Sequence, residues 1–169
     1  IGDSIRHRGP DVDGYFIDDF CGIAHRRLSI IDLDNGHQPM HSPDGRYVIA
    51  YNGETYNYQE LQKELMALGH SFQTNCDTEV ILHGYMQWGD EVTKHLRGMF
   101  AFVIWDREQK VLFGARDPFG IKPMYYADMG DLFFFGSELK SFLPHPGFKK
   151  ELNKEALKFY LTFQYSALE

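Results

Sequence analysis

The stretch from Tyr47 to Asn57, YVIAYNGETYN, constrains the fold most, because an uninterrupted apolar run meets a polar pair. The run from Tyr47 to Tyr51 is typical of a strand buried on both faces, and we expect that strand to end at Asn52 and Gly53. Asn carries an amide donor, and Gly lets a ligand approach a bare backbone N–H. The pair therefore suits an oxyanion hole made of one side chain and one main-chain donor.

The same dipeptide has a simpler interpretation, because Asn-Gly is the commonest two-residue hairpin signal. The residues that follow favour a helix instead of a returning strand. Asn57 is placed to cap a helix with Glu60 at the capping-box position, and leucines recur on one face until Gly69. We expect the polar pair to lead into this helix.

Composition restricts the classes of partner. The chain has 169 residues with 43% hydrophobic content, which fits one ordered domain. Its net charge of −7 argues against nucleic acid or an anionic membrane as a partner, and no signal peptide or spanning run is visible. The two cysteines, Cys21 and Cys76, do not indicate a disulfide scaffold, so we expect a reducing, cytoplasmic location.

Several short apolar runs alternate with few helical patterns, which indicates an α+β architecture of packed sheets. Residues 32–46 are predicted to form a polar loop, and short strands are predicted at Tyr15–Ile17, Phe20–Ala24, His25–Ile31, Ser71–Thr74, Met99–Trp105, Lys110–Ala115, Met124–Ala127 and Leu132–Phe135. Helices are predicted after Asn57 and Asp77, at Glu138–Leu143 and at Leu152–Phe163.

Charged residues supply the other candidate site groups. Arg27 lies among apolar residues. Its guanidinium either lies in solvent at the edge of a strand or binds a carboxylate through two hydrogen bonds. Asp77 is placed either as a helix N-cap or as a ligand-binding carboxylate. The basic segment Arg6–Arg8 precedes Gly9 and Pro10, and it ends a helix or binds an anion. No phosphate loop and no zinc-ligand spacing occurs, so we expect no metal site.

Taken in order, these residues resemble the glutaminase domain of the glutamine-hydrolysing asparagine synthetases, which are class II glutamine amidotransferases. The similarity covers about 150 residues in eight blocks: Arg6–Asp11, His25–Asp32, Gln38–Pro39, Asn52–Asn57, Asp77–Val80, Gly98–Phe102, Arg116–Pro123 and Ser137–Lys140. The resemblance implies the four-layer α-β-β-α sandwich of the N-terminal-nucleophile hydrolases.

The resemblance also implies roles in binding glutamine. Arg27 is expected to pair with the α-carboxylate, while Asp77 and Glu54 receive the α-ammonium. Asn52 and the Gly53 N–H are expected to hold the oxyanion, a contribution of roughly 3 kcal/mol per donor. Backbone groups of four further residues are expected to line the ligand, namely Leu28, Ser29, Ile30 and Ile31.

In this family the nucleophile is a cysteine at the mature N-terminus, activated by its own α-amino group. Ile1 cannot serve, so we expect the chain to be trimmed at both ends and to be inactive by itself. Cys21-Gly22-Ile23 imitates the family's N-terminal motif, but Cys21 falls where the family has a core position. Cys76 lies beside Asp77 but has no α-amine.

The family's second domain makes aspartyl-AMP from aspartate and ATP with Mg²⁺, and ammonia then displaces AMP. Its Ser-Gly-Gly-x-Asp-Ser nucleotide loop is absent here, so ATP, Mg²⁺ and aspartate belong to sequence outside this chain. We expect residues 1–149 to form the type 2 amidotransferase domain and residues 150–169 to begin the synthetase domain, with a homodimer possible for the whole protein.

Two alternatives remain. One is a non-catalytic scaffold that has lost its nucleophile, as in β-lactam synthetase-like relatives. The other is a plain amidohydrolase without a synthetase domain, and the amphipathic pattern Leu152–Phe163 counts against it. The residue that follows the initiator Met in the intact protein separates the enzyme from the scaffold.

Overall fold

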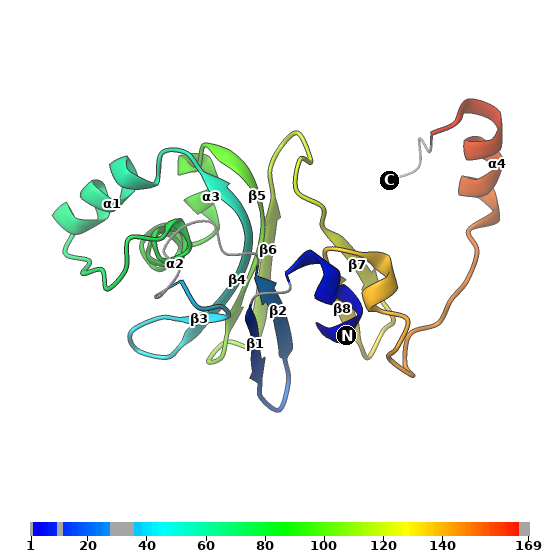
Figure 1. The fold of residues 1–169 in the computed structure, drawn as a ribbon, viewed down its shortest axis with the longest axis horizontal. Coiled ribbons are helices and arrows are strands. Elements are labelled where there is room, and N and C mark those ends of the chain that lie inside the picture. The colour runs from blue at the N-terminus through cyan, green and yellow to red at the C-terminus, as the bar shows by residue number, and fades with distance from the viewer. Residues whose placement is uncertain (1, 10–11, 28–35, 166–169) are drawn as a thin grey trace.

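A computed structural model of the chain describes residues 2–9, 12–27 and 36–165. Its centre is a four-stranded antiparallel sheet in the order β3-β4-β5-β6 (Figure 1). These strands are β3 (Met40–His41), β4 (Tyr47–Thr55), β5 (Gly98–Asp106) and β6 (Val111–Arg116). The three longer strands match runs that the sequence predicted, and they are neighbours in this sheet.

Both faces of β4 are buried, as its apolar run predicts. The hairpin of β1 (Val12–Ile17) and β2 (Gly22–Arg27) covers one face, where Phe16 and Ile23 pack against Val48 and Trp105. The opposite face is covered by α1 (Tyr58–Ala67) and α2 (Asp77–Trp88) (Figure 1). Successive residues of β4 therefore face different layers, because side chains alternate along a strand.

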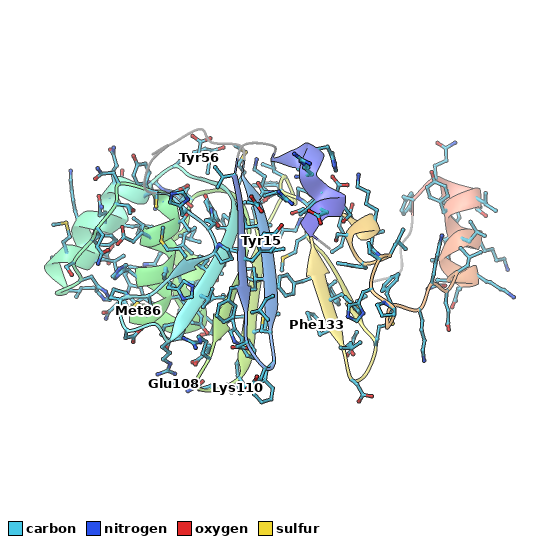
Figure 2. The ribbon with its side chains drawn as sticks, turned by 60° about the horizontal axis from the view of Figure 1, so that its bottom comes forward. Tyr15, Tyr56, Met86, Glu108, Lys110 and Phe133 are labelled. Carbon is cyan, nitrogen blue, oxygen red and sulfur yellow. The ribbon has the colours of Figure 1, made fainter. Side chains whose placement is uncertain are left out.

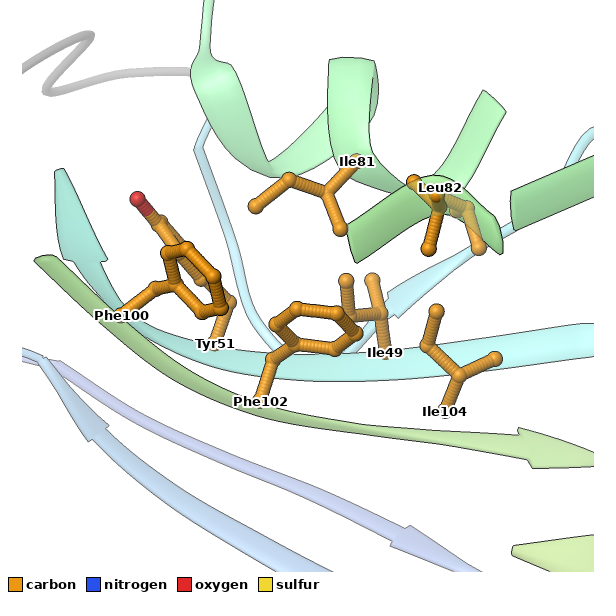
Figure 3. Close-up of a cluster of buried hydrophobic side chains, with 8 residues drawn as sticks. Ile49, Tyr51, Ile81, Leu82, Phe100, Phe102 and Ile104 are labelled. Atoms are coloured by element: carbon orange, nitrogen blue, oxygen red, sulfur yellow. The ribbon is translucent and has the colours of Figure 1, made fainter. Parts of the chain in front are cut away.

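The core between the sheet and α2 is built from side chains of β4 and β5 that meet the helix (Figure 3). The labelled members are Ile49, Tyr51, Ile81, Leu82, Phe100, Phe102 and Ile104. Tyr51 is the member with a polar end, and α2 begins at Asp77, so the same packing sets the position of a tyrosine hydroxyl beside the start of the helix.

The remaining described elements are short helices, one further hairpin and the last helix. They are η1 (Gly2–Arg8), η2 (Gly89–Glu91), α3 (Val92–His95), the hairpin of β7 (Tyr125–Asp128) and β8 (Phe133–Gly136), η3 (Leu139–Ser141) and α4 (Lys154–Phe163). In Figure 2, Glu108 and Lys110 mark the turn between β5 and β6, and Phe133 marks β8. No described helix is long and apolar enough to cross a bilayer.

The basic segment Arg6–Arg8 pairs within the chain. Glu138 accepts hydrogen bonds from His7 at 2.9 Å and Arg8 at 3.3 Å, and Lys140 forms an ion pair with it at 2.9 Å. Hydrogen bonding from Lys140 is the main reason that the pKa of Glu138 falls to about 2. This carboxylate ties η1 to η3.

The helix α4 lies apart from the other elements and has no buried residue (Figure 1). Its start follows the usual rule for N-caps, since the Asn153 side chain accepts hydrogen bonds from the backbone N–H groups of Glu155 and Ala156.

The predicted end of the strand is wrong: β4 does not end at Tyr51 but continues through Asn52 and Gly53 to Thr55. No hairpin forms at Asn-Gly, and α1 follows after Tyr56 and Asn57, as the sequence favoured. The strand continues because it pairs with β5 along its whole length. Gly53 is required for this close approach, because a Cβ at this position would lie 2.3 Å from the Met99 carbonyl oxygen.

Two further local predictions fail because the polar groups take other partners. Asn57 precedes α1 but does not cap it; its amide donates to the His95 carbonyl and accepts from the Arg97 N–H, both at 2.9 Å. Residues 71–74 form no strand. The backbone N–H groups of Gln73 and Thr74 donate to the Glu79 carboxylate at 2.9 and 2.7 Å instead.

Candidate active site

A cavity of about 670 Å³ lies beside β2, β4, β5 and the start of α2. Four of the predicted site residues line it: Asn52, Gly53, Glu54 and Asp77. The backbone of Arg27 pairs with Val12 at the end of β2, but its side chain and residues 28–31 lie outside the described part of the chain.

The backbone N–H of Gly53 lies on the edge of β4 that faces away from β5. Amide groups alternate in direction along a strand, so residues 51, 53 and 55 present their N–H groups to the same side. The Tyr51 N–H donates to Gln38 at 2.6 Å, and the Thr55 N–H donates to Asp77 at 3.0 Å. Between them, the Gly53 N–H has no partner among the described residues, so it is available to a ligand.

Asn52 and Glu54 project from the face of β4 opposite Tyr51 and Thr55, again because of the alternation along the strand. Asn52 is half-buried and Glu54 is exposed. Neither side chain makes a hydrogen bond or ion pair within the described residues, although both line the cavity. An amide donor, a backbone N–H and a carboxylate, none with a partner among the described residues, thus occupy consecutive positions.

The sequence offered Asp77 as a possible N-cap of α2, but the N-cap in the structure is Cys76 and Asp77 is the first residue of the helix. Its carboxylate makes no capping bond. Instead, its Oδ2 atom accepts hydrogen bonds from the Tyr51 hydroxyl at 2.6 Å and from the Thr55 N–H at 3.0 Å. A carboxylate at a helix N-terminus is also stabilised by the helix dipole. Asp77 is buried against protein but reaches the cavity.

Sequence reasoning missed Gln38 as a site residue. Its Oε1 accepts from the Tyr51 N–H at 2.6 Å, and its Nε2 donates to the Thr78 hydroxyl at 3.3 Å. β3 pairs only with Val48 and Ile49 of β4, so it offers no backbone acceptor to the Tyr51 N–H. The Gln38 side chain accepts this hydrogen bond instead. The Gln38–Pro39 block was the only sequence signal, and it carried no indication of these partners.

His25 is a second residue that lines the cavity without having been assigned to it. Its Nε2 lies 3.1 Å from the Tyr51 carbonyl oxygen, so β2 contacts the same residue of β4 as Gln38 does. The position of His25 in β2 was predicted, but the contact depends on how the hairpin packs on the sheet.

Neither cysteine has the chemistry of an activated nucleophile. Burial, followed by the charge of Asp18, raises the pKa of Cys21 to about 11. Burial also raises the pKa of Cys76, whose sulfur lies 3.0 Å from the Thr74 hydroxyl. Reactive cysteines have a depressed pKa, because the thiolate is the nucleophile. Within the described ranges, no group of three His, Cys, Asp or Glu side chains is arranged to hold a metal ion.

Comparisons with known proteins show the family of the chain. Residues 1–169 match the family described as "Glutamine amidotransferase domain". The chain is 52% identical over 161 residues to glutamine-hydrolyzing asparagine synthetase 1 of Bacillus subtilis (strain 168), a match that covers 95% of the chain and 25% of that protein. It is 43% identical over 138 residues to the asparagine synthetase of Zea mays, covering 81% and 23%. The chain thus spans about a quarter of these relatives.

Solved structures show the same relationship. Glutamine phosphoribosylpyrophosphate amidotransferase from B. subtilis, complexed with ADP and GMP, matches with a TM-score of 0.59 and 29% sequence identity. The match covers 72% of this chain and 28% of that one. A second solved structure, described as the allosteric regulatory enzyme of purine biosynthesis, matches with a TM-score of 0.53 and 30% identity.

Proposed function

The chain belongs to the class II glutamine amidotransferase domain family, closely related to the N-terminal region of asparagine synthetases, and we propose that it is the glutaminase part of such an enzyme. In this proposal it hydrolyses glutamine to glutamate and ammonia, and the whole protein uses the ammonia to convert aspartate to asparagine with ATP. The observation that carries the proposal is the Gly53 N–H on an open strand edge, beside the uncommitted Asn52 amide and near the Asp77 carboxylate.

Each group of glutamine then has a partner of matching chemistry. The α-ammonium is received by Asp77, with Glu54 at the exposed side. The α-carboxylate is bound by Arg27 and by backbone groups of Leu28–Ile31. The side-chain carbonyl oxygen is placed between the Asn52 amide and the Gly53 N–H, which stabilise it as negative charge develops.

The reaction needs a thiolate that attacks this carbonyl. The raised pKa values of Cys21 and Cys76 disfavour both. The family resemblance implies that the nucleophile is a cysteine at the mature N-terminus of the whole protein, with its α-amino group as the base, and we adopt this assignment. Attack gives a tetrahedral oxyanion, its collapse releases ammonia and leaves a thioester, and water hydrolyses the thioester to glutamate.

The proposal includes the finer architecture. A helical layer, the central sheet and the β1–β2 hairpin support a four-layer α-β-β-α sandwich. The absence of buried residues in α4 supports a boundary near residue 150, with residues 150–169 beginning the synthetase domain. ATP, Mg²⁺ and aspartate are then bound by the part of the protein that this chain does not span.

The test is ammonia release from glutamine by the full-length protein and its Asn52→Ala variant. We expect kcat to fall by about 10² to 10³ when one oxyanion donor is removed. Gln59→Ala, on the exposed side of α1, is the control and should leave kcat unchanged. A full-length protein that binds glutamine without releasing ammonia would favour the non-catalytic scaffold.

A further inference from the structure

The Tyr51 hydroxyl is buried beside Asp77, although the two residues are 26 positions apart in sequence. It lies 2.6 Å from Asp77 Oδ2 and 3.2 Å from the Thr55 hydroxyl. Burial, and then the charge of Asp77, raises the pKa of Tyr51, so the phenol stays protonated and donates to the carboxylate. A donor on a charged acceptor makes a stronger hydrogen bond than a neutral pair.

Both described donors to Asp77 come from β4 and converge on one oxygen. The Tyr51 hydroxyl and the Thr55 N–H both bind Oδ2, which restricts rotation of the carboxylate. The Oδ1 atom has no hydrogen-bond donor among the described residues, and Asp77 lines the cavity. One oxygen is thus held by the fold, while the other is left to accept from a ligand.

We propose that Tyr51 is a positioning residue: its hydroxyl orients the Asp77 carboxylate so that Oδ1 receives the α-ammonium of the substrate. Tyr51 then determines selectivity for amides that carry an α-ammonium group. This inference rests on the proposed function, and it adds a residue to which neither the sequence motifs nor the comparisons assign a role.

The geometry also indicates that the hydroxyl can be removed without displacing the helix. Gln38 binds both the Tyr51 N–H and the Thr78 hydroxyl, so it connects β4 to the first turn of α2 independently. The Tyr51 ring packs in the core with Ile81 and Phe102, and a phenylalanine keeps this packing. Tyr51→Phe therefore keeps the packing and removes the orienting bond, together with the 3.2 Å contact to the Thr55 hydroxyl.

The experiment compares two ligands in the full-length protein: glutamine, and glutaramate, which is glutamine without the α-ammonium. We expect Tyr51→Phe to raise KM for glutamine about tenfold, the loss of one hydrogen bond to a charged group, with kcat changed less than about twofold. The inhibition constant of glutaramate should change less than about twofold. Tyr47→Phe, on the same face of β4, is the control and should alter neither value.

A double-variant cycle tests whether Tyr51 acts through Asp77. In an Asp77→Asn background, adding Tyr51→Phe should raise KM for glutamine by less than about twofold. The positioning role would be overturned if Tyr51→Phe weakened the binding of glutamine and of glutaramate equally. It would also be overturned if Tyr51→Phe still raised KM for glutamine tenfold in the Asp77→Asn background.

The design separates this inference from the proposed function. If the unmodified full-length protein releases no ammonia from glutamine, the function fails and the inference with it. If ammonia is released but Tyr51→Phe leaves KM unchanged, only the inference fails. Retained glutaramate inhibition and an unchanged thermal unfolding midpoint show that the variant's site is folded.

Discussion

Arg46 and Asp106 form a side-on ion pair, with Nη2 at 2.6 Å and Nε at 3.1 Å from the same carboxylate oxygen, Oδ2. Asp106 is also the register partner of Tyr47 at the end of the β4–β5 ladder. Its other oxygen accepts from the N–H groups of Glu108 and Gln109, both at 2.9 Å, in the turn that leads to β6. One buried carboxylate therefore holds both a strand end and a turn.

Replacing Asp106 should destabilise the domain. Asp106→Asn leaves the Arg46 charge without its buried partner, and such losses cost about 3 kcal/mol of unfolding free energy. Urea denaturation of the two proteins measures the difference. Glu108→Gln is the matched control, because Glu108 also contacts Arg46, at 3.2 Å, but is exposed. It should change stability by less than about 0.5 kcal/mol.

The same carboxylate predicts a pH dependence of stability. Burial alone would raise the pKa of Asp106, but hydrogen bonds from Arg46, Gln109 and Glu108 outweigh it, so the pKa lies below 3.8. A depressed carboxyl pKa adds stability that is present above the unfolded-state value and is lost as pH falls through the folded-state value. Below about pH 4, the free energy of unfolding should therefore decrease as the pH is lowered. Asp106→Asn should weaken the dependence of unfolding free energy on pH. An unchanged slope of unfolding free energy against pH in this variant would contradict the prediction.

Gly53→Ala should damage both stability and activity. The added Cβ would lie 2.3 Å from the Met99 carbonyl, so β4 and β5 must separate, at a cost of about 1 to 3 kcal/mol. The same movement displaces the Gly53 N–H from the cavity. Chemical denaturation and ammonia release measure the two effects. Gly22→Ala is the control, because a Cβ there meets nothing within 4 Å.

Cys21→Ala should leave ammonia release by the full-length protein within about twofold of its original value. With a pKa of about 11, about a thousandth of this thiol is ionised at pH 8, which is unsuited to nucleophilic attack. Alkylation of Cys21 by iodoacetamide should likewise be slow at pH 8. Activity that disappears in Cys21→Ala would identify Cys21 as the nucleophile.

Deleting residues 150–169 should change the unfolding free energy of this domain by less than about 0.5 kcal/mol, because α4 buries no residue against it. The comparison is made on the 169-residue chain by urea denaturation. A loss of more than about 1 kcal/mol would place α4 within the amidotransferase domain and contradict the boundary near residue 150.

The sequence by itself determined most of the elements. Apolar runs and helical periodicity identified β4, β5, β6, α1, α2 and α4 to within a few residues, because each pattern reflects which faces of that element are buried. The ordered motifs also predicted the family to which the chain belongs. Both signals are local, so a single chain displays them before it is folded.

Only the tertiary structure decided how the polar groups are paired. Asn57 was predicted to cap its own helix and binds α3 instead. Asp77 was open between a helix cap and a ligand-binding carboxylate, and it accepts from Tyr51. Gly53 was expected at a strand end and lies within a strand, where its N–H has no partner among the described residues because β3 pairs only with Val48 and Ile49. The physical reason is that a buried polar group takes whichever partner packing brings within about 3 Å, and that partner can lie anywhere in the sequence.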